Sequence, residues 1–401
     1  MANVSSSNGL EKRPKLRFPG FDDPYRTITL GQIASLVNRT DPTSNAPIMM
    51  LSAGNGFIMQ SEKYSRDNAG QSLKKYILLK KGELAYNHGA SKAKQYGCCY
   101  ELTENEARIP YVYHCFKISG TEHTPYVATA LNNPKIDRQL KRLVSSSVRM
   151  DGLLNISFDD YMSVILHLPS LKEQTHIADF LKKLDERITS QEKLVASLKK
   201  YKRGVNNQIL SQIDNSYNCR LGSVCEIVGG GTPDTLHTEY WGNTVEWFTP
   251  SEIGKTKYVN NSVRKLSDIG LDNSSAKLLP IGTVLLTTRA TLGEMSIAKQ
   301  ECSTNQGFQS LIPHTDRVSS EYLYYMQIII KPWCEKYASG NTFREISKSA
   351  LSDCIIPIPD RARQEQIVKL LSSIDMLIGA AESISMSLSK IRHGLMQQLF
   401  I

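Results

Sequence analysis

The sequence predicts an α+β protein in which two mixed α/β domains are joined by two long helices that form an antiparallel coiled coil. The first observation behind this prediction is an internal repeat: LPSLKEQTHIADFLKKLDERI at 168–188 returns, much altered, as IPDRARQEQIVKLLSSIDMLI at 358–378. A shift of 190 residues aligns the two stretches without a gap, which is close to half of the 401-residue chain. The second is the spacing of apolar residues within both stretches, and the third is the presence of short β-type runs in the segments before them. The sequence therefore predicts two related halves with a pseudo-two-fold arrangement.

The repeated stretches read as helices because their apolar residues recur mostly at alternating spacings of four and three, the pattern of a coiled-coil seam. Pro169 and Pro359 stand just ahead of these helices, where a missing amide donor costs little. About 35 residues at 1.5 Å each give a rod of roughly 50 Å. The two rods bury their stripes most simply against each other, although each could instead pack on its neighbouring domain. The predicted seam residues, also taken as partner-binding positions, are Ile177, Leu181, Leu184, Ile188, Leu198, Ile367, Leu371, Ile374, Ile378 and Leu388.

The two globular segments share a frame but differ inside it. Both are rich in Gly, Thr, Ser, Asn and Tyr, and they open alike, with LGQIASLV at 30–37 and LGSVCEIV at 221–228. They also close alike before each helix, and they diverge almost completely in between, as two related domains reading different ligands would. The predicted boundaries are a basic N-terminal arm at 1–20, a first domain at 21–167, a first helix at 168–217, a second domain at 218–357 and a second helix at 358–401.

Charge and composition narrow the class of protein. The chain has 48 Lys and Arg against 39 Asp and Glu, a net charge of +9, which favours an anionic partner such as nucleic acid or an anionic membrane surface. The arm, with Lys12, Arg13, Lys15 and Arg17 against Glu11, is expected to be flexible. No run of about 18 apolar residues is present, and the N-terminus lacks the apolar core of a secretory signal. The eight cysteines form no Cys-x-x-Cys pair, so reduced thiols in a cytoplasmic protein are expected.

Motifs for catalysis do not hold up in this sequence. EIGKT at 252–256 ends like a phosphate-binding loop, but Thr249 replaces the first glycine of that motif. GGGTP at 229–233 has no following Lys and is interpreted as a flexible strand connection. The chain contains no Pro-Pro for an amino-methyltransferase loop, and Asp234 and Glu239 lack the Lys that nuclease chemistry needs. Isolated histidines such as His88 and His114 are interpreted as satisfied surface or core residues. No catalytic or metal-binding residues are predicted.

Basic residues among Thr, Ser, Asn and aromatic residues are more informative, because such segments can place Lys on phosphates and Arg on guanine edges. They could equally be ordinary polar surface loops. Four stretches have this character: 87–97, 247–257, 287–293 and 339–349. The candidate DNA-binding residues within them are Lys92, Lys94, Lys255, Lys257, Arg289, Arg344 and Lys348.

Taken in order, these segments resemble the specificity subunits of type I restriction–modification systems. The matching stretches are LRFPGF (16–21), LGSVCEIVGGGTPDT with EYWG and VEWFTPSEI (221–253), TTRATLGEMSIA (287–298), NQGFQSLIP (305–313), SGNTFREISKSALSDCIIPIP (339–359) and the two Pro…Gln…Ile…Leu…Asp helices. The first domain matches mainly at LGQIASLV and LLKKGELAYN.

The resemblance implies that each variable domain is a target-recognition domain that reads one half of a bipartite, asymmetric sequence in double-stranded DNA. It further implies that the helices set the half-site spacing and dock two modification subunits, which methylate adenine using S-adenosylmethionine. Two restriction subunits could add ATP- and Mg-dependent cleavage, so this non-catalytic chain would hold no cofactor itself. Other interpretations remain open: a self-contained methyltransferase or nuclease, a coiled-coil scaffold that binds only proteins, or the specificity subunit of a related modification system.

Overall fold

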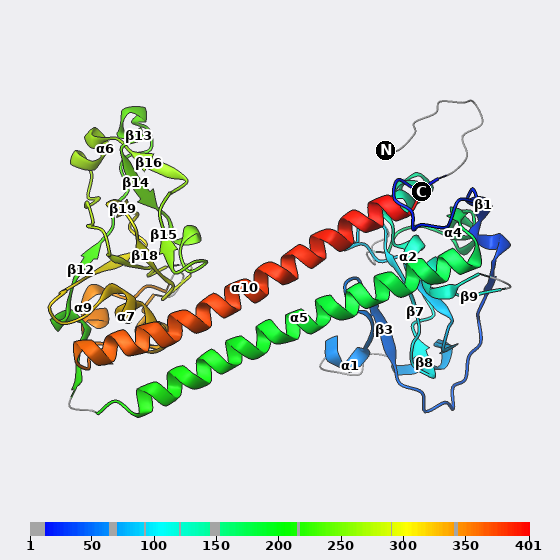
Figure 1. Cartoon of the computed structure of the whole chain (residues 1–401), viewed down its shortest axis with the longest axis horizontal. Helices are drawn as coiled ribbons and strands as arrows, with labels where there is room; N and C mark the ends of the chain where they lie inside the picture. The colour runs from blue at the N-terminus through cyan, green and yellow to red at the C-terminus, as the bar shows by residue number, and fades with distance from the viewer. Residues whose placement is uncertain are drawn as a thin grey trace. The chain divides into compact units, whose positions relative to one another are not determined.

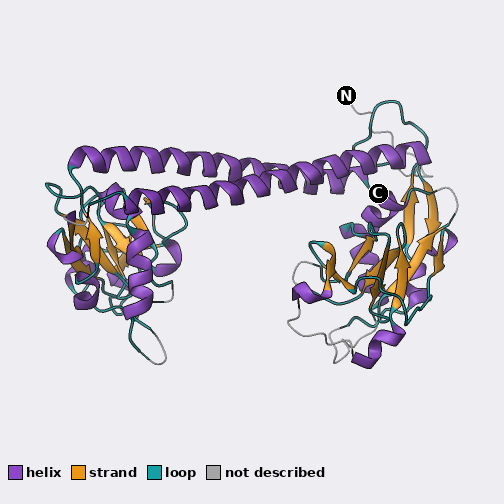
Figure 2. Ribbon diagram, turned by 90° about the horizontal axis from the view of Figure 1, so that it is seen from below, coloured by secondary structure: helices purple, strands orange, loops and turns teal. Residues whose placement is uncertain are grey.

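The computed structural model describes residues 13–63, 70–91, 94–119, 122–144, 153–214, 217–289, 291–340 and 344–401, and the chain divides into two compact units. Unit 1 comprises residues 1–192 and 384–401, and unit 2 comprises residues 193–383. Two long helices, α5 (Leu171–Ser211) and α10 (Arg361–Leu399), each contribute residues to both units (Figure 1). In both units, short helices flank the strands (Figure 2).

Unit 1 is organised around an antiparallel sheet of four strands in the order β2-β9-β6-β7. These strands are β2 (Ala34–Leu36), β9 (His114–Ile118), β6 (Leu84–Asn87) and β7 (Cys98–Glu101). Three further antiparallel pairs join β1 (Arg26–Thr29) to β10 (Ile165–Leu168), β3 (Met49–Ser52) to β4 (Gly56–Met59) and β5 (Ile77–Lys80) to β8 (Glu106–Ile109). The helical elements are η1 (Leu30–Gln32), α1 (Gln60–Lys63), η2 (Gly70–Lys75), α2 (Thr124–Leu131), α3 (Pro134–Leu143) and α4 (Phe158–Met162).

Aromatic packing joins the sheet of unit 1 to helix α4. Tyr86 of β6 stacks on Tyr161 of α4, with ring centroids 3.8 Å apart and planes 8° from parallel. The His88 and His114 rings stack at 4.9 Å, and both nitrogens of His88 lie within 3 Å of a backbone carbonyl, those of Leu154 and Val112. The prediction that these histidines are satisfied within the protein is confirmed.

Because His114 is largely buried and lies beside His88, its pKa is lowered, chiefly by desolvation. The unfolded chain then binds this proton more readily, so the free energy of unfolding of unit 1 is expected to fall as pH drops below about 6.5, by at most about 1.4 kcal/mol per pH unit. Amide exchange of β9 measured at pH 7.5 and 5.5 would report this. His114→Gln should weaken the dependence, whereas His314→Gln, an exposed histidine of unit 2, should leave it unchanged.

Unit 2 contains two sheets. The five-stranded sheet has the order β12-β20-β17-β18-β15, and the four-stranded sheet has the order β13-β16-β14-β19. β15 pairs in parallel with β18, and β14 in parallel with β19, while the other pairs are antiparallel. The strands are β12 (Cys225–Gly229), β13 (Trp241–Gly242), β14 (Val245–Phe248), β15 (Tyr258–Val259), β16 (Arg264–Leu266), β17 (Val284–Leu286), β18 (Met295–Ala298), β19 (Cys302–Thr304) and β20 (Gln309–Pro313).

The remaining elements of unit 2 close the chain against its helices. β11 (Asn218–Arg220) pairs with β21 (Ile355–Pro357) just before α10 begins. The helical elements are η4 (Leu221–Ser223), η5 (Thr238–Tyr240), η6 (Pro250–Glu252), α6 (Asp268–Asp272), α7 (Ser320–Tyr325), α8 (Gln327–Tyr337) and α9 (Lys348–Ser352).

The long helices pack against each other in antiparallel order within each unit. In unit 1, Ile177 and Leu181 near the start of α5 share a core with Met396 and Leu399 near the end of α10. In unit 2, Ile209 near the end of α5 shares a core with residues from the start of α10, such as Leu371. In both units, therefore, the start of one helix packs against the end of the other. Each seam is continuous with the core of its own unit, so both packing modes considered from the sequence occur together. The predicted fold class is confirmed.

The internal repeat is visible as identical contacts in the two units. Gln174 Nε2 donates to the Pro169 carbonyl at 3.0 Å, and Gln364 Nε2 donates to the Pro359 carbonyl at 2.9 Å. Each glutamine Oε1 also accepts a backbone N–H from its own unit. Likewise, Arg392 pairs with Asp185 in unit 1, and Lys202 pairs with Asp375 in unit 2 at 2.5 Å. The shared residues of the repeat therefore maintain a shared frame.

Two sequence interpretations are corrected by the packing of the chain. Residues 13–20 of the arm are not free: the Arg17 guanidinium forms a bidentate ion pair with buried Glu173, at 2.9 and 2.7 Å, and Phe18 packs on His176. The GGGTP stretch is not a flexible connection either. A Cβ at Gly230 would lie 1.9 Å from the Asn305 carbonyl oxygen, so this backbone is packed too closely for any side chain.

Other sequence-based expectations can be compared directly with the structure. All eight cysteines are free thiols, and burial raises the pKa of Cys98 to about 11. Within the described ranges, no cluster of three or more His, Cys, Asp or Glu side chains is placed to hold a metal ion. The helices in the described part of the chain are all too short or too polar to cross a bilayer. In the EIGKT stretch, the Gly254 N–H donates to Ser296 Oγ at 3.1 Å, which leaves it unavailable to a phosphate.

Candidate nucleic-acid interface

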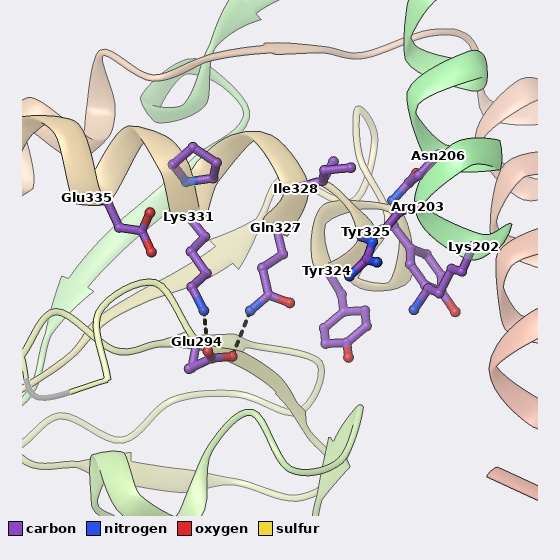
Figure 3. A pocket seen from close by; sticks show the side chains of 11 residues that line it. Lys202, Arg203, Asn206, Glu294, Tyr324, Tyr325, Gln327, Ile328, Lys331 and Glu335 are labelled. Atoms are coloured by element: carbon purple, nitrogen blue, oxygen red, sulfur yellow. Dashed lines mark hydrogen bonds and ion pairs between the residues drawn. The ribbon is translucent and has the colours of Figure 1, made fainter. Parts of the chain in front are cut away.

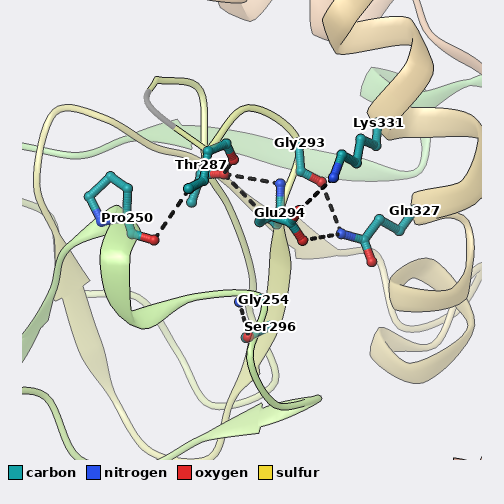
Figure 4. Close-up of polar contacts among 9 residues, drawn as sticks. Pro250, Gly254, Thr287, Gly293, Glu294, Ser296, Gln327 and Lys331 are labelled. Atoms are coloured by element: carbon teal, nitrogen blue, oxygen red, sulfur yellow. Dashed lines mark hydrogen bonds and ion pairs between the residues drawn. The ribbon is translucent and has the colours of Figure 1, made fainter. Parts of the chain in front are cut away.

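Three of the polar loops selected from the sequence converge in unit 2. The central one runs from Thr287 to Glu294, between β17 and β18. The Thr287 hydroxyl accepts the Glu294 N–H at 3.0 Å, and the Gly293 N–H donates to the Thr287 carbonyl at 2.8 Å (Figure 4). Gly293 has a φ of 78°, and a Cβ there would lie 2.9 Å from Lys331 Cα, so the tight turn against α8 requires glycine.

The Glu294 side chain fixes this central loop to helix α8. Its carboxylate accepts from Lys331 Nζ at 2.5 Å and from Gln327 Nε2 at 3.1 Å. Gln327 Nε2 also donates to the Gly293 carbonyl at 3.0 Å. Because two hydrogen bonds from Gln327 and the ion pair with Lys331 hold the turn against α8, the described residues of this loop are presented in a fixed position. This is the property that a recognition loop needs if it is to bind without a large ordering cost.

The other two loops are tied to the central one. The Thr291 hydroxyl contacts the Pro250 carbonyl at 3.4 Å, which connects the η6 loop and its exposed Lys255. On the other side, Arg289 Nε forms an ion pair with Glu345 at 2.8 Å, and Glu345 in turn exchanges backbone hydrogen bonds with Ser339. The structure thus brings together the 247–257, 287–293 and 339–349 segments, within their described residues.

A cleft of about 490 Å³ lies beside this network, between the end of α5 and helices α7 and α8 (Figure 3). Its lining mixes charged and aromatic side chains, including Lys202, Arg203, Tyr324 and Lys331. Lys331 is paired with Glu294, and Lys202 is paired with Asp375, so much of the positive charge that lines the cleft is neutralised by carboxylates of the same unit. These pairs fix the loop and the helices in place, and they do not form a nucleophile–base arrangement.

The predicted DNA-binding residues differ in their availability. Lys255 and Lys348 are exposed. Arg289 is paired with Glu345, and the Arg344 guanidinium donates to the carbonyls of Glu335 and Ala338. In unit 1, Lys94 Nζ donates to the Asn132 carbonyl at 2.9 Å, while Lys92 lies outside the described residues.

Lys257 has an internal position. Its ammonium donates to the Tyr325 hydroxyl at 3.2 Å and to Ser372 Oγ of α10 at 3.1 Å, and it lies 4.5 Å from the Tyr325 ring centroid. Burial lowers the pKa of this ammonium. These contacts give Lys257 a role in holding the 247–257 segment to α10, which is distinct from the phosphate contact expected from the sequence.

The predicted partner-binding residues of the helices lie mainly in the cores of the units. Ile177, Leu181, Ile367, Leu371, Ile374 and Ile378 are buried, and Leu184, Ile188, Leu198 and Leu388 are partly buried. A partner subunit cannot reach the buried ones without opening the seam. Other apolar side chains of α10 are exposed. In unit 2, Leu370 (46% exposed) and Leu377 (58%) lie seven residues apart, and in unit 1, Ile384 (48%) and Ile391 (54%) do so too, while Met376 and Met386 are also exposed. None of these positions was predicted as a partner-binding residue from the sequence.

Two α/β units that share a frame, differ in their loops and share a pair of antiparallel helices define a class of two-domain binding proteins. Comparisons with known structures agree with this fold. The chain aligns with a type I restriction–modification S subunit from M. genitalium over 97% of this chain and 99% of the other, with a TM-score of 0.59 and 14% identity. It also aligns with a chain from a structure of the type I R-M system, over 96% and 98%, with a TM-score of 0.58 and 18% identity.

Sequence comparisons find relatives of the same kind. Residues 214–386 match the model of the type I restriction modification DNA specificity domain. The MjaIX specificity subunit of Methanocaldococcus jannaschii is 35% identical over 186 residues, covering 45% of this chain and 43% of the relative. The EcoR124I/EcoR124II specificity subunit of Escherichia coli is 25% identical over 214 residues, covering 50% and 52%. The chain spans about half the length of the curated relatives that it matches.

Most of unit 2 therefore lies within the segment that matches the type I restriction modification DNA specificity domain. The resemblance of the chain to the specificity subunits of type I restriction–modification systems is confirmed.

Proposed function

We propose that this chain is the sequence-specificity subunit of a type I restriction–modification complex, in which each unit binds one half of a bipartite, asymmetric DNA target. The observation that carries the proposal is the repeat of one frame around unlike loops. The Gln174 and Gln364 contacts are the same, whereas the loops between the shared segments differ. A duplicated frame with divergent loops suits two readers of different sequences, because the frame fixes the loops and the loops carry the specificity.

The chain itself supplies recognition, and partner subunits supply the chemistry. Two modification subunits would bring S-adenosylmethionine for adenine methylation, and restriction subunits, where present, would use ATP and Mg for translocation and cleavage. In unit 2, the exposed Leu370 and Leu377 of α10 offer a partner a surface that is separate from the buried seam. The two long helices, shared by both units, would set the distance between the half-sites.

Methylome sequencing of the host, with and without this chain, tests the proposal directly. The expected result is one bipartite motif whose methylation disappears when the chain is removed. Persistence of every methylated motif would contradict the proposal. The same set of methylated motifs with and without this chain is the result expected for a coiled-coil scaffold that binds only proteins.

DNA affinity is expected to depend steeply on salt. A complex that neutralises about six phosphates loses roughly 10³ in affinity between 50 and 200 mM salt, because bound counterions are released on association. Fluorescence anisotropy with the complex of this chain and its modification subunits measures this slope. Lys255→Gln should reduce the slope by about one, since it removes one exposed cation, and a slope near zero for the unaltered complex would exclude phosphate binding.

A further inference from the structure

Arg264, the first residue of β16, has a guanidinium group that is held in place without using its hydrogen-bond donors. The guanidinium carbon lies 3.4 Å from the centroid of the Trp241 ring and 5.5 Å from that of Trp247. Trp247 is the direct cross-strand partner of Arg264, and the two indoles pack edge to face at 5.1 Å. Stacking of this kind orders the long side chain, so less conformational entropy is lost when the group binds a ligand.

The free donors of Arg264 are unusual in unit 2. Of the eight arginines in this unit, six use the guanidinium in an ion pair or hydrogen bond: Arg220, Arg289, Arg317, Arg344, Arg361 and Arg363. Arg264 and Arg203, within the described ranges, do not, and Arg203 lies on helix α5. The carboxylate nearest in the sheet register is that of Glu246, which is occupied by Lys265 at 2.5 Å. Among the described residues, Arg264 is thus the arginine of the β-sheet part of unit 2 whose guanidinium forms no ion pair with a carboxylate.

The surroundings of Arg264 suit contact with a base edge. Val263, the preceding residue, is 86% exposed, while its N–H donates to Glu252 Oε1 at 2.8 Å. The backbone of Arg264 is also fixed, because Ser262 Oγ donates to its carbonyl at 2.6 Å. An exposed apolar side chain beside a guanidinium on a rigid strand matches the two kinds of group that read the major groove: Arg binds guanine O6 and N7, and apolar side chains touch the thymine methyl.

We propose that Arg264 is a specificity-determining residue of unit 2 that reads a guanine in the half-site bound by this unit. The inference rests on the proposed function and deepens it. A planar fork stacked on Trp241 can form two parallel hydrogen bonds to one guanine, and no other base presents two acceptors in that arrangement. It follows that this half of the bipartite target contains at least one G·C pair on which recognition depends.

The test uses the complex of the full chain with its modification subunits, carrying Arg264→Lys or Arg264→Gln. First, the motif of the unaltered complex is determined by methylome sequencing. Kd is then measured for duplexes in which each G·C pair of the second half-site is replaced in turn. The unaltered complex is expected to discriminate against one such replacement by about tenfold or more. Arg264→Gln is expected to lose this discrimination while reading the first half-site as before, and Arg264→Lys, which lacks the planar fork but can still donate to guanine, is expected to weaken it.

Several outcomes would overturn the inference. It is wrong if Arg264→Gln retains the original motif, if the second half-site contains no G·C pair, or if both variants weaken every duplex equally, which is the result expected for the phosphate-contact control Lys255→Gln. Thermal melting of the variants separates a packing role from a reading role. Arg264→Gln removes both the fork and the charge, so a folded Arg264→Gln complex with unchanged discrimination would exclude base reading by Arg264. If the unaltered complex shows no sequence preference at all, the proposed function itself is wrong.

Discussion

Leu377→Glu is expected to weaken association of the chain with modification subunits by about tenfold or more, while leaving the chain folded. Leu377 is 58% exposed and lies seven residues after the exposed Leu370 in the unit 2 part of α10. Covering such a side chain at an interface is worth about 1.5–3 kcal/mol, and about 1.4 kcal/mol corresponds to a factor of ten in affinity. A buried glutamate without a partner adds a further penalty. Co-purification and analytical ultracentrifugation measure the loss.

Ser383→Glu is the matched control for this substitution. It adds the same charge to the same helix and the same unit, at an exposed position that is not spaced by seven residues from Leu377. We expect this variant to bind modification subunits as the unaltered chain does. If the Leu377→Glu variant binds as well as the Ser383→Glu variant, the surface around Leu370 and Leu377 is not the docking surface. Because both positions are exposed, circular dichroism of the two variants should match that of the unaltered chain.

The frame of the molecule could be predicted because its determinants are repeated in the sequence. The shift of 190 residues makes Gln174 and Gln364 equivalent, and each donates to the carbonyl of the proline five residues before it. The spacing of the apolar residues predicted the helices, because side chains that are buried against a partner helix recur every 3.5 residues. The equivalence of Asp185 and Asp375 was also readable, but their cationic partners come from the other helix, so those pairs could be found only in three dimensions.

The candidate interface was less predictable, because charge in a loop does not reveal whether that charge is free. Lys257 and Arg289 look alike in sequence, yet one is engaged by Tyr325 and Ser372 and the other by Glu345. Arg264 lay outside the selected loops, because its significance depends on a tryptophan 23 positions earlier that reaches it through strand pairing. Local composition identified where polar loops occur. Tertiary contacts decide which cations are left for a ligand.

Lengthening both long helices by one turn is expected to change the preferred gap between half-sites by one or two base pairs and to leave both half-sites unchanged. Four residues add about 6 Å and rotate the following helix by about 40° beyond a full turn. One base pair of B-DNA advances about 3.4 Å and rotates by about 35°. The rise and rotation of the insertion therefore correspond to about one to two base pairs. An insertion of seven residues would add about 10 Å but almost no rotation, so it would not match the rotation of the three base pairs that span this distance.

The insertion must be made in both helices, because they are antiparallel partners. In unit 1, Asp185 pairs with Arg392, so Ser190, five residues after Asp185, lies roughly level with Ser387, five residues before Arg392. Four helix-forming residues inserted after Ser190 and just before Ser387 keep the two helices in register with each other. The same insertion after Ser190 alone shifts one seam against the other, and we expect it to lower the melting temperature. Methylome sequencing reports the gap and both half-sites together. If the doubly lengthened chain modifies the original motif with its original gap, the helices do not set the spacing.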